Sequence, residues 1–549
     1  MTDEASARQF LDPQMGDIYP PEALAAVPEA ADRITQAIES GKKIVIYGDY
    51  DVDGITAVSI LWHCLTLAGA NVEFYIPHRL EEGYGVNGDA IGVLADEGAG
   101  MVISVDCGVT AIEPAEIAKR RGVEFIITDH HQPATDASGQ VTLPDALIVH
   151  PTVSRTGAAD YPNPHISGAG VALKLAWAVA QSLSNSKKVS AAYRSFLVDA
   201  TGLAALGTIA DVVPLTGENR IIAQHGLRGL ARSGLPGLTA LIESAGLTGQ
   251  SLSGYDIGFK LAPRLNAIGR MGHARLAVEL LTRATSDEAK MIAKNLNDQN
   301  TARQKLQNRI AKEAREMVIE QRQNADTVRG IVLASSRWHA GVIGIVASKV
   351  MEEFGRPTVM IALENGVGQG SGRSVRNFAP ARGLRVMPRS SYLLRRPCHG
   401  GRPADRLSKS GRLSHGVSES RGQMLTPVDL RPKLSIDDMV SLADLTPQLV
   451  SDFSRLEPFG AGNPPATLAT DWLEVYGDPR TVGTNGSHLQ VTLTDGRHRC
   501  KGIAFSMAKY ADDLSNHRRC RVAFQPIMNE WQGRRTVEMQ IADFQFPDR

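Results

Sequence analysis

The sequence predicts an α/β protein with a small all-β domain in its carboxyl-terminal part. From residue 42 to about 215, short β-branched runs alternate with helical stretches, as in a parallel sheet covered by helices. A long polar helical pattern and a second strand–loop–helix unit follow. After about residue 430 the pattern changes to short strands separated by turns, which is typical of a barrel or sandwich.

Length and composition agree with several ordinary folded domains. The 549 residues suffice for three or four domains, and 43% apolar with 21% charged residues is usual for a globular protein. The 59 Lys plus Arg residues balance 59 Asp plus Glu residues, so any site for a polyanion must be local. The five scattered cysteines form no CxxC pair, the amino terminus is acidic, and no apolar run could span a membrane. We therefore expect a cytoplasmic protein without a membrane segment.

Three strand runs define the first α/β unit. They are KKIVIY (42–47), MVISV (101–105) and VEFIIT (123–128). The first run is followed by GDYDVDG and then by a helical stretch that ends at a glycine. A last apolar piece, LAALGTIADVVPL (203–215), carries a further aspartate just after its apolar residues.

A polar helical pattern from Ser286 to about Gln323 connects the two α/β units. Acidic residues occupy its first turn, where they favour a helix start. Its larger apolar side chains fall on one face: Leu306, Ile310 and Met317. So polar a pattern predicts a helix that bridges two domains rather than one buried in a single core. From Gly330, GIVLASSRWHAGVIGIVASKV again predicts strand, loop and helix.

The last part of the chain predicts a small barrel or sandwich of about 110 residues. Its short strands are HLQVTLTD, CKGIAF, CRVAFQPI and TVEMQIADF. They alternate apolar and polar residues, as half-buried strands do.

Three carboxylates, Asp49, Asp51 and Asp53, come directly after the first strand. So close together they repel one another, which favours a hard cation such as Mg²⁺ or Mn²⁺ among them. The spacing also resembles the start of a calcium-binding EF-hand loop, but position twelve of that loop is Ile60 instead of Glu. An Asp-rich turn without a metal is the structural alternative.

The next two strands end in the same residue types. Asp106 follows the strand 101–105, and Asp129, His130 and His131 follow the strand 123–128. Because ligands gather beyond the carboxyl ends of parallel strands, these side chains are expected to converge. Singly, such residues are more often helix caps or surface decoration. Together with Asp211, the set is hard to explain as turns and caps.

This group of carboxylates and imidazoles matches a site for two ions about 3.5 to 4 Å apart. Such a pair clamps the attacking and leaving oxygens of a phosphoryl group, so we expect hydrolysis of a phosphoester or phosphoanhydride. The sequence shows no Ser-His-Asp or Cys-His order and no GxxxxGK[ST] loop.

These residues resemble the DHH phosphoesterase family, named for its Asp-His-His, and within it the exonucleases specific for single-stranded DNA. The supporting strings, in family order, are IVIYGDYDVDG, YIPHRLEEGYGVN, SVDCG, TDHH, GTIADVVPL, LAPRLNAIGR, WHAGVIGIVAS, GSGRS and RLEPFGAGNP. The resemblance implies a metal-dependent exonuclease that digests single-stranded DNA in the 5′→3′ direction and releases 5′-mononucleotides in DNA repair and recombination.

The resemblance also implies a domain organisation. It consists of four parts in chain order: a DHH domain with a parallel sheet (1–215), a connecting helical region (216–325), an α/β DHH-associated domain (326–429) and an OB-like nucleic-acid-binding barrel (430–549). In the barrel, aromatic residues are candidates for stacking on bases, with core packing as the alternative for each: Trp472, Tyr476, Tyr510 and Trp531.

By the same resemblance, site residues can be assigned. Two Mn²⁺ or Mg²⁺ ions would be held by Asp51, Asp53, Asp106, His130 and Asp211, with Asp49 in or beside that shell. Asp129 and His131 are catalytic candidates, because His131 could donate a hydrogen bond to the scissile phosphate. Candidates around the 5′-terminal phosphate are Arg79, Arg264, Asn266, Arg270, Ser371 and Arg373. Ordinary surface or capping arginines are the alternative for this last group.

Single-stranded DNA is the expected partner of a monomeric protein, and the resemblance adds single-strand-binding protein and a helicase. One alternative function is a DHH phosphodiesterase for short oligonucleotides or cyclic dinucleotides. Another is a catalytically impaired DNA-binding protein, which depends on an unusual basic segment.

That segment, Arg376 to Arg421, contains eleven Lys plus Arg and only two acidic residues. A basic loop for nucleic acid is one interpretation. However, the family carries GGHAMAAG here, where this chain has RRPCHGGR (395–402). The codons GGC GGC CAT GCC ATG GCG GCC GGC encode GGHAMAAG, and read one base earlier, after a C, they encode RRPCHGGR. We therefore interpret about 376–424 as a frame-shifted translation between two compensating indels.

Overall fold

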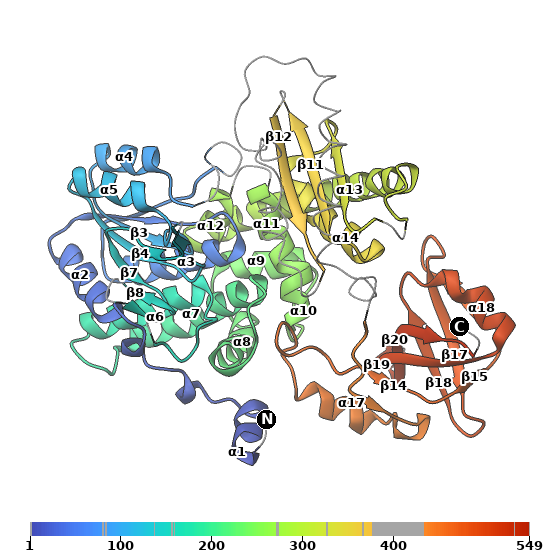
Figure 1. Cartoon of the computed structure of the whole chain (residues 1–549). Coiled ribbons are helices and arrows are strands. Elements are labelled where there is room, and N and C mark those ends of the chain that lie inside the picture. The colour runs from blue at the N-terminus through green and yellow to red at the C-terminus, as the bar shows by residue number, and fades with distance from the viewer. Residues whose placement is uncertain are drawn as a thin grey trace.

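The computed structural model confirms the predicted fold class (Figure 1). It describes residues 3–547 with the following exceptions: 79–81, 83–84, 137, 155–156, 159, 271–273, 326–327, 365–366, 376–432 and 532. The segment interpreted as frame-shifted thus lies outside the described residues. No helix in the described part of the chain has the length and apolar character needed to cross a membrane.

A five-stranded parallel sheet forms the centre of the first domain, in the order β2-β1-β3-β4-β7. Its strands are β1 (Lys43–Tyr47), β2 (Val72–Tyr75), β3 (Ala99–Val105), β4 (Glu124–Thr128) and β7 (Leu147–Val149). Successive residues of β1 belong to different cores, because side chains alternate between the two faces of a strand. Ile44 and Ile46 pack into one core, and Val45 and Tyr47 into the other.

Helices cover both faces of this sheet, as a parallel sheet requires. Figure 1 shows α4 and α5 on one side and α6 and α7 on the other. The main helices of the domain are α2 (Val27–Glu39), α3 (Val52–Leu67), α4 (Gly88–Asp96), α5 (Ile112–Arg120), α6 (Gly168–Leu183) and α7 (Ala191–Ala210). α3 is buried along most of its length because it packs between the sheet, α6 and α7.

A helical region follows the first domain. Its helices are α8 (Gly217–Leu230), α9 (Pro236–Ser244), α10 (Gly254–Asp256), η3 (Ile257–Leu261), α11 (Ala262–Arg270), α12 (Arg275–Thr282) and α13 (Ser286–Glu320). α13 begins where the sequence predicted and ends three residues before the predicted Gln323. Glu288 accepts hydrogen bonds from the backbone and hydroxyl of Thr285, which closes a capping box at its start.

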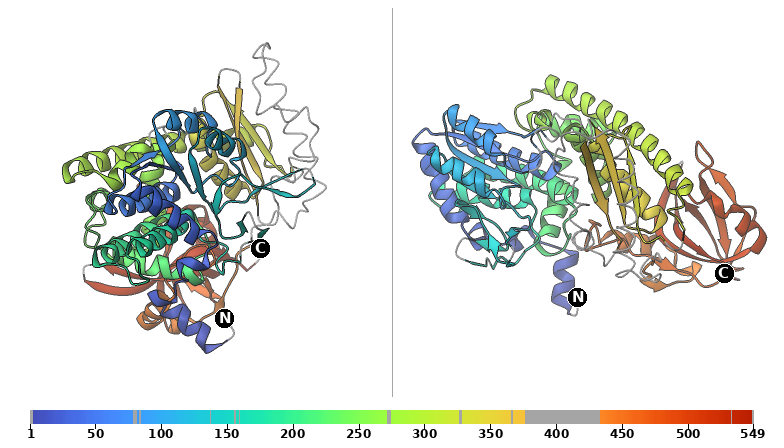
Figure 2. Two further views of the ribbon diagram at one scale, coloured as in Figure 1. Left: turned by 90° about the vertical axis from the view of Figure 1, so that its left-hand side faces the viewer. Right: turned by 45° about the horizontal axis from the view of Figure 1, so that its top comes forward.

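The prediction that this long helix bridges two domains is confirmed. Near its start, Ala289, Ala293 and Leu296 belong to the core of the first domain. Near its end, Ile310 and Val318 belong to a separate core with the next sheet. The right-hand view of Figure 2 shows the yellow-green helix α13 running beside the second sheet.

The second α/β unit has three strands and one long helix in its described part. β10 (Ile331–Ser335) and β11 (Thr358–Glu364) are parallel, and β12 (Val367–Arg373) is antiparallel to β11. α14 (Ala340–Phe354) connects the two parallel strands and packs on the sheet.

The carboxyl-terminal domain is a closed barrel, since β19 pairs with both β15 and β20, and the path β15-β17-β18-β20 completes the ring. The barrel strands are β15 (Leu473–Val475), β17 (His488–Thr494), β18 (Arg499–Ala504), β19 (Arg519–Trp531) and β20 (Arg534–Gln545). Additional elements are β13 (Asp438–Met439), β14 (Leu468–Ala469), β16 (Arg480–Val482), α17 (Pro447–Ser454) and α18 (Ala511–His517). The predicted all-β domain is therefore confirmed.

Residues 455–463, called the connecting arm below, link this barrel to the first domain through hydrogen bonds. The N–H of Leu215 donates to the carbonyl of Ala461 at 2.7 Å. The guanidinium of Arg220, which is almost fully buried, donates to the carbonyls of Leu456 and Glu457 at 3.0 and 2.8 Å. The arm therefore lies against the loop that follows α7.

Candidate metal centre

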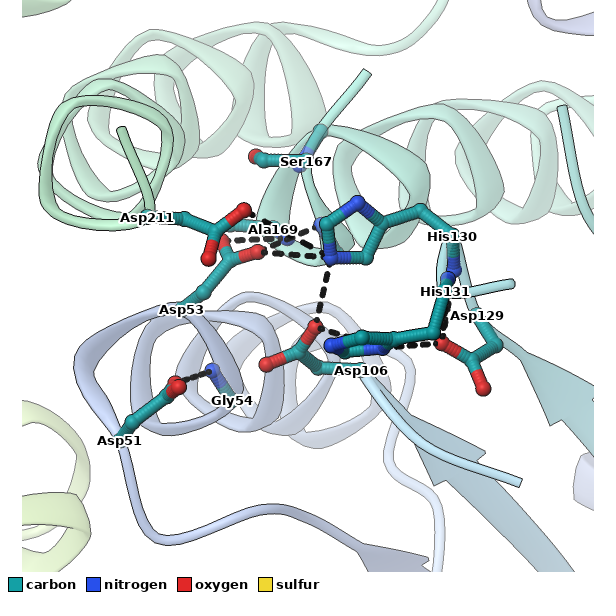
Figure 3. Close-up of polar contacts among 12 residues, drawn as sticks. Asp51, Asp53, Gly54, Asp106, Asp129, His130, His131, Ser167, Ala169 and Asp211 are labelled. Carbon is teal, nitrogen blue, oxygen red and sulfur yellow. Dashed lines mark hydrogen bonds and ion pairs between the residues drawn. The ribbon is translucent and has the colours of Figure 1, made fainter. Parts of the chain in front are cut away.

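The residues predicted to converge do so at the carboxyl edge of the parallel sheet (Figure 3). Three overlapping groups each offer ligand atoms within 4.8 Å of one another. These groups are Asp49, Asp51 and Asp106; Asp53, His130 and Asp211; and Asp106, His130 and His131. Because Asp106 and His130 each belong to two groups, the arrangement has room for two neighbouring ions.

Asp53 is held at the centre by backbone donors of α6. It lies in the first turn of α3 and is 1% exposed. The N–H groups of Gly168 and Ala169 donate to its Oδ2 and Oδ1 at 2.6 and 2.9 Å. A Cβ at Gly207 of α7 would lie 2.5 Å from Oδ1, so a glycine is required where α7 passes the carboxylate.

Sequence reasoning missed these three positions. The available signal was the string Ser167-Gly-Ala-Gly, a serine helix cap followed by small residues. Ser167 does cap α6 by accepting from the N–H of Gly170 at 3.1 Å. The small residues bring the helix start close enough for its amides to reach Asp53.

The ring of His130 faces three carboxylates. Its Nε2 lies 3.1 Å from Oδ1 of Asp106 and 3.7 Å from Oδ2 of both Asp53 and Asp211. Within the described residues, neither His130 Nε2 nor Asp106 Oδ1 has a hydrogen-bond partner, although both are buried. Buried polar atoms are usually paired, so this donor set fits a divalent cation bound between them.

The electrostatics of the group also fit a bound cation. Burial raises the pKa of Asp53 and raises that of Asp106 well above its usual range, with neighbouring carboxylates adding to both effects. Burial, Asp53 and Asp51 raise the pKa of Asp211 to about 8. Burial lowers the pKa of His130. Without a counter-charge these carboxylates oppose one another's ionisation, and a divalent ion would offset that repulsion.

Backbone geometry sets the position of Asp106. Its φ of 58° lies in the left-handed region, which a residue other than glycine rarely adopts. The helix that follows, α5, starts only at Ile112 and has Ala111 as its cap. Asp106 is therefore not a helix cap, and its strained backbone turns the carboxylate toward His130.

Asp51 combines a structural role with a place in the group. Its Oδ1 accepts from the N–H of Gly54 at 3.1 Å and caps α3. Asp51 is therefore a helix cap, which was the alternative to a metal ligand, and the same side chain also lies close to Asp49 and Asp106. A carboxylate has a second oxygen, so one side chain can serve both purposes.

Asp129 lies beside the group and orients His131. It accepts from the backbone N–H groups of Val109, His130 and His131 at 2.7 to 3.1 Å. Its Oδ1 also lies 2.8 Å from Nδ1 of His131. Burial lowers the pKa of His131, but the bond to Asp129 and the surrounding carboxylates outweigh this and raise it to about 9. The contact with Asp129 therefore favours the protonated form of His131.

The residues predicted around the terminal phosphate do not form one group in the described part of the structure. Arg79 lies outside the described residues. Arg264 donates to the carbonyls of Lys260 and Ser244 at 2.6 and 3.5 Å, which is the capping role considered as its alternative. Asn266 lies on α11 and is partly buried.

Three of the predicted residues lie on or against α14. Arg373 donates to Ser348 of α14 at 3.1 Å and to Ser371, its neighbour on β12, at 3.3 Å. Arg270, at the end of α11, donates to the carbonyl of Gly341 at 3.1 Å. Ser371 and Arg373 therefore form one polar group, and Arg270 connects the helical region to α14.

Comparison with protein families agrees with this architecture. Residues 43–208 match the N-terminal domain of the DHH family. Residues 436–543 match the RecJ OB domain.

Two curated relatives are called single-stranded-DNA-specific exonuclease RecJ. The Bacillus subtilis protein is 36% identical over 98% of this chain, and the chain spans 66% of its length. The Thermus thermophilus protein is 32% identical over 97% of this chain and 73% of its own length.

Solved structures give the same result. The Thermus thermophilus RecJ structure with Mn²⁺ has a TM-score of 0.78 and 29% identity, covering 99% of this chain and 74% of that one. A manganese-bound exonuclease RecJ has a TM-score of 0.61 and 32% identity, covering 74% of this chain and 98% of the other. The chain therefore belongs to the RecJ family of DHH phosphoesterases, metal-dependent exonucleases specific for single-stranded DNA.

Proposed function

We propose that this chain hydrolyses single-stranded DNA in the 5′→3′ direction, releases 5′-mononucleotides, and serves DNA repair and recombination. The observation that carries this proposal is the set of overlapping ligand groups that share Asp106 and His130. Two Mn²⁺ or Mg²⁺ ions would be held by Asp49, Asp51, Asp53, Asp106, His130 and Asp211. Bound there, the ions would supply the positive charge that stabilises the attacking and leaving oxygens.

The protein's own residues would prepare the site for this chemistry. The amides of Gly168 and Ala169 keep the Asp53 carboxylate fixed, so that it does not reorganise during the reaction. Asp129 holds His131 protonated, and we assign His131 the hydrogen bond to a non-bridging oxygen of the scissile phosphate. Water adds to phosphorus, the bond from phosphorus to O3′ breaks, and O3′ gains a proton.

We propose that the 5′ end is recognised where α11 and β12 lie near α14. Arg270 would act there with Ser371 and Arg373, and Arg79 and Asn266 would complete the group by the family resemblance. Arg264 is assigned a supporting role, because its guanidinium is bound to backbone carbonyls. A guanidinium suits a terminal phosphate, since it presents parallel donors.

A domain organisation accompanies this proposal. The DHH domain (1–215) would bind the ions. The helical region (216–325) and the DHH-associated domain (326–429) would form the opposite wall of the site. The barrel (430–549) would bind the DNA strand. The barrel favours a polymer over the short oligonucleotides or cyclic dinucleotides of other DHH phosphodiesterases, since it provides an extended binding surface. A monomeric state, a cytoplasmic location, and contacts with single-strand-binding protein and a helicase belong to the same proposal.

Strands labelled at either end test the function. With Mn²⁺, we expect mononucleotides from the 5′ end of single strands and little release from duplex. Arg373→Ala should weaken the preference for a 5′-phosphate over a 5′-hydroxyl, whereas Arg337→Ala, an exposed arginine in the same domain, should not. Release that begins at the 3′ end, or equal attack on duplex, would contradict the proposal.

A further inference from the structure

The connecting arm contacts the loop that carries Asp211, a residue of the candidate metal centre. This loop, residues 211–216, joins α7 to α8. Asp211 is its first residue, and its Oδ2 lies 3.7 Å from Nε2 of His130. Leu215, four residues later, donates its N–H to the carbonyl of Ala461 in the arm at 2.7 Å. One short loop therefore connects a proposed metal ligand with the segment that leads to the barrel.

The arm meets this loop at close range. The backbone groups of Gly460 and Asn463 exchange two hydrogen bonds, at 2.9 and 3.1 Å, and form a turn that faces the loop. A Cβ on Gly460 would lie 2.7 Å from Cδ1 of Leu215, and a Cβ on Gly462 would lie 3.0 Å from Cβ of Pro214. Leu215 is 1% exposed and belongs to the core of the first domain, so its side chain has little space to move. So close an approach of the arm depends on glycine.

Hydrogen bonds give the arm a defined position. The side chain of Asn463 donates to the carbonyls of Leu456 and Pro458 at 2.8 and 3.0 Å. The buried guanidinium of Arg220 on α8 donates to the carbonyls of Leu456 and Glu457. Because α8 begins directly after the loop, the arm is fixed to the same helix that the loop enters.

The loop is strained at Val212, the residue after Asp211. Its φ of 62° lies in the left-handed region, which is unfavourable for a β-branched residue. The side chain of Val212 is 68% exposed, so its packing does not hold the backbone in this conformation. A strained conformation persists only when the surrounding structure imposes it. Here α7 holds the loop on one side, and the bond from Leu215 to the arm holds it on the other.

We propose that the connecting arm positions Asp211 for metal binding, through Leu215 and the strained turn at Val212. This inference rests on the proposed function, which assigns Asp211 as a ligand. If the arm withdraws from Leu215, the turn at Val212 can relax, and the neighbouring Asp211 turns away from His130. Gly460 and Leu215 are thus positioning residues that act through Asp211. The metal centre is complete only when the arm of the barrel lies against the first domain.

A methyl group added at position 460 tests this inference. Gly460→Ala should push Leu215 away from the arm and weaken Mn²⁺ binding to the full chain about 10-fold, since ligands that lose their outer support bind metal less well. Isothermal titration with Mn²⁺ in the absence of DNA measures the affinity without any turnover. Gly234→Ala is the matched control, because a Cβ there would meet none of the described residues within 4 Å beyond its chain neighbours. Its affinity should equal that of the unchanged protein.

A second substitution should restore the affinity. Leu215→Ala removes the side chain that the added methyl group would meet, and its N–H remains to donate to Ala461. The double variant Gly460→Ala/Leu215→Ala should therefore bind Mn²⁺ nearly as well as the unchanged protein. Its melting temperature in EDTA should nevertheless fall, because a core side chain is lost. A merely structural effect would make the least stable protein also the weakest binder.

Asn463→Ala loosens the arm without adding any atom to it. The carbonyls of Leu456 and Pro458 lose their donor, so the turn that faces Leu215 is held less firmly. Mn²⁺ binding should weaken in this variant as well. It gives a readout even if Gly460→Ala fails to fold.

Asp211→Asn separates this inference from the proposed function. If this variant binds Mn²⁺ more weakly while Gly460→Ala and Asn463→Ala bind it like the unchanged protein, the arm has no positioning role and only this inference is overturned. A double variant that binds Mn²⁺ no better than Gly460→Ala would overturn it too. If Asp211→Asn binds Mn²⁺ as well as the unchanged protein, Asp211 is not a ligand, and the inference fails together with that assignment.

Discussion

The backbone N–H of Gly168 donates a hydrogen bond of 2.6 Å to Oδ2 of Asp53, although the two residues are 115 positions apart in the chain. Gly168 is the first residue of α6, so the carboxylate lies at the positive end of that helix. A Cβ at position 168 would lie 2.5 Å from Oδ1 of Asp106. One small residue therefore sets the spacing between two carboxylates of the candidate metal centre.

Gly168→Ala should weaken metal binding while the protein stays folded. The added methyl group would push Asp106 away from His130, and we expect the affinity for Mn²⁺ to fall by about 10-fold or more, since misplaced ligands bind poorly. Isothermal titration with Mn²⁺ measures this directly. Gly92→Ala is the control, because a Cβ there would have no atom within 4 Å. Equal affinities for the two variants would contradict the role of Gly168.

Asp106→Asn should stabilise the metal-free protein and remove its response to metal. The substitution removes one charge from the buried group of carboxylates, so the melting temperature in EDTA should rise by a few degrees. A bound ion stabilises the native state, so Mn²⁺ should raise the melting temperature of the unchanged protein. It should raise that of the variant much less. Thermal unfolding with EDTA and with Mn²⁺ tests both effects, and an equal Mn²⁺ shift in the two proteins would exclude Asp106 as a ligand.

His63 should make the fold less stable in acid. It is partly buried on α3, and its Nε2 lies 2.8 Å from the carbonyl oxygen of Leu281. Burial lowers the pKa of His63, although Leu281 and Asp199 partly oppose this. Because the folded-state pKa lies below the unfolded value of about 6.5, the unfolded state binds more protons below pH 6.5. The contribution of His63 to stability is therefore complete above that pH and declines as the pH falls.

Urea unfolding in EDTA at pH 7 and pH 5 measures this contribution. Between the two pH values, the free energy of unfolding should fall less for His63→Gln than for the unchanged protein. His165→Gln, at an exposed histidine of the first domain, should lose as much as the unchanged protein. An identical loss in all three proteins would show that His63 is not the group concerned.

Restoring the reading frame across residues 376–424, so that RRPCHGGR becomes GGHAMAAG, should increase the rate of hydrolysis by about 100-fold. In the family motif, the glycines let the backbone approach the substrate, and the histidine can reach the phosphate opposite the ions. Rates on a labelled single strand at saturating Mn²⁺ compare the two proteins. Their affinity for Mn²⁺ should be equal, since the proposed ligands lie outside this segment. Equal rates would show that the basic sequence is a native element.

The convergence of the aspartates could be predicted because it follows from sheet topology. Residues after the parallel strands β1, β3 and β4 must meet at one edge, whatever the details of packing. The bridging role of α13 could also be predicted, since its mixed polar and apolar pattern excludes burial of the helix in one core. The role of Arg264 could not be predicted from the sequence, because the carbonyl of Ser244 to which it donates belongs to another helix.

The sequence by itself determined the order of strands and helices, the residues at the strand ends, and thereby the kind of metal centre, because these depend on local periodicity and on the rules of parallel sheets. Only the tertiary structure decided that the amides of α6 hold Asp53 and that α7 passes this carboxylate so closely that position 207 requires glycine. Both depend on how helices distant in the chain pack against one another. That packing reflects the shapes of many side chains together, which no short sequence pattern contains.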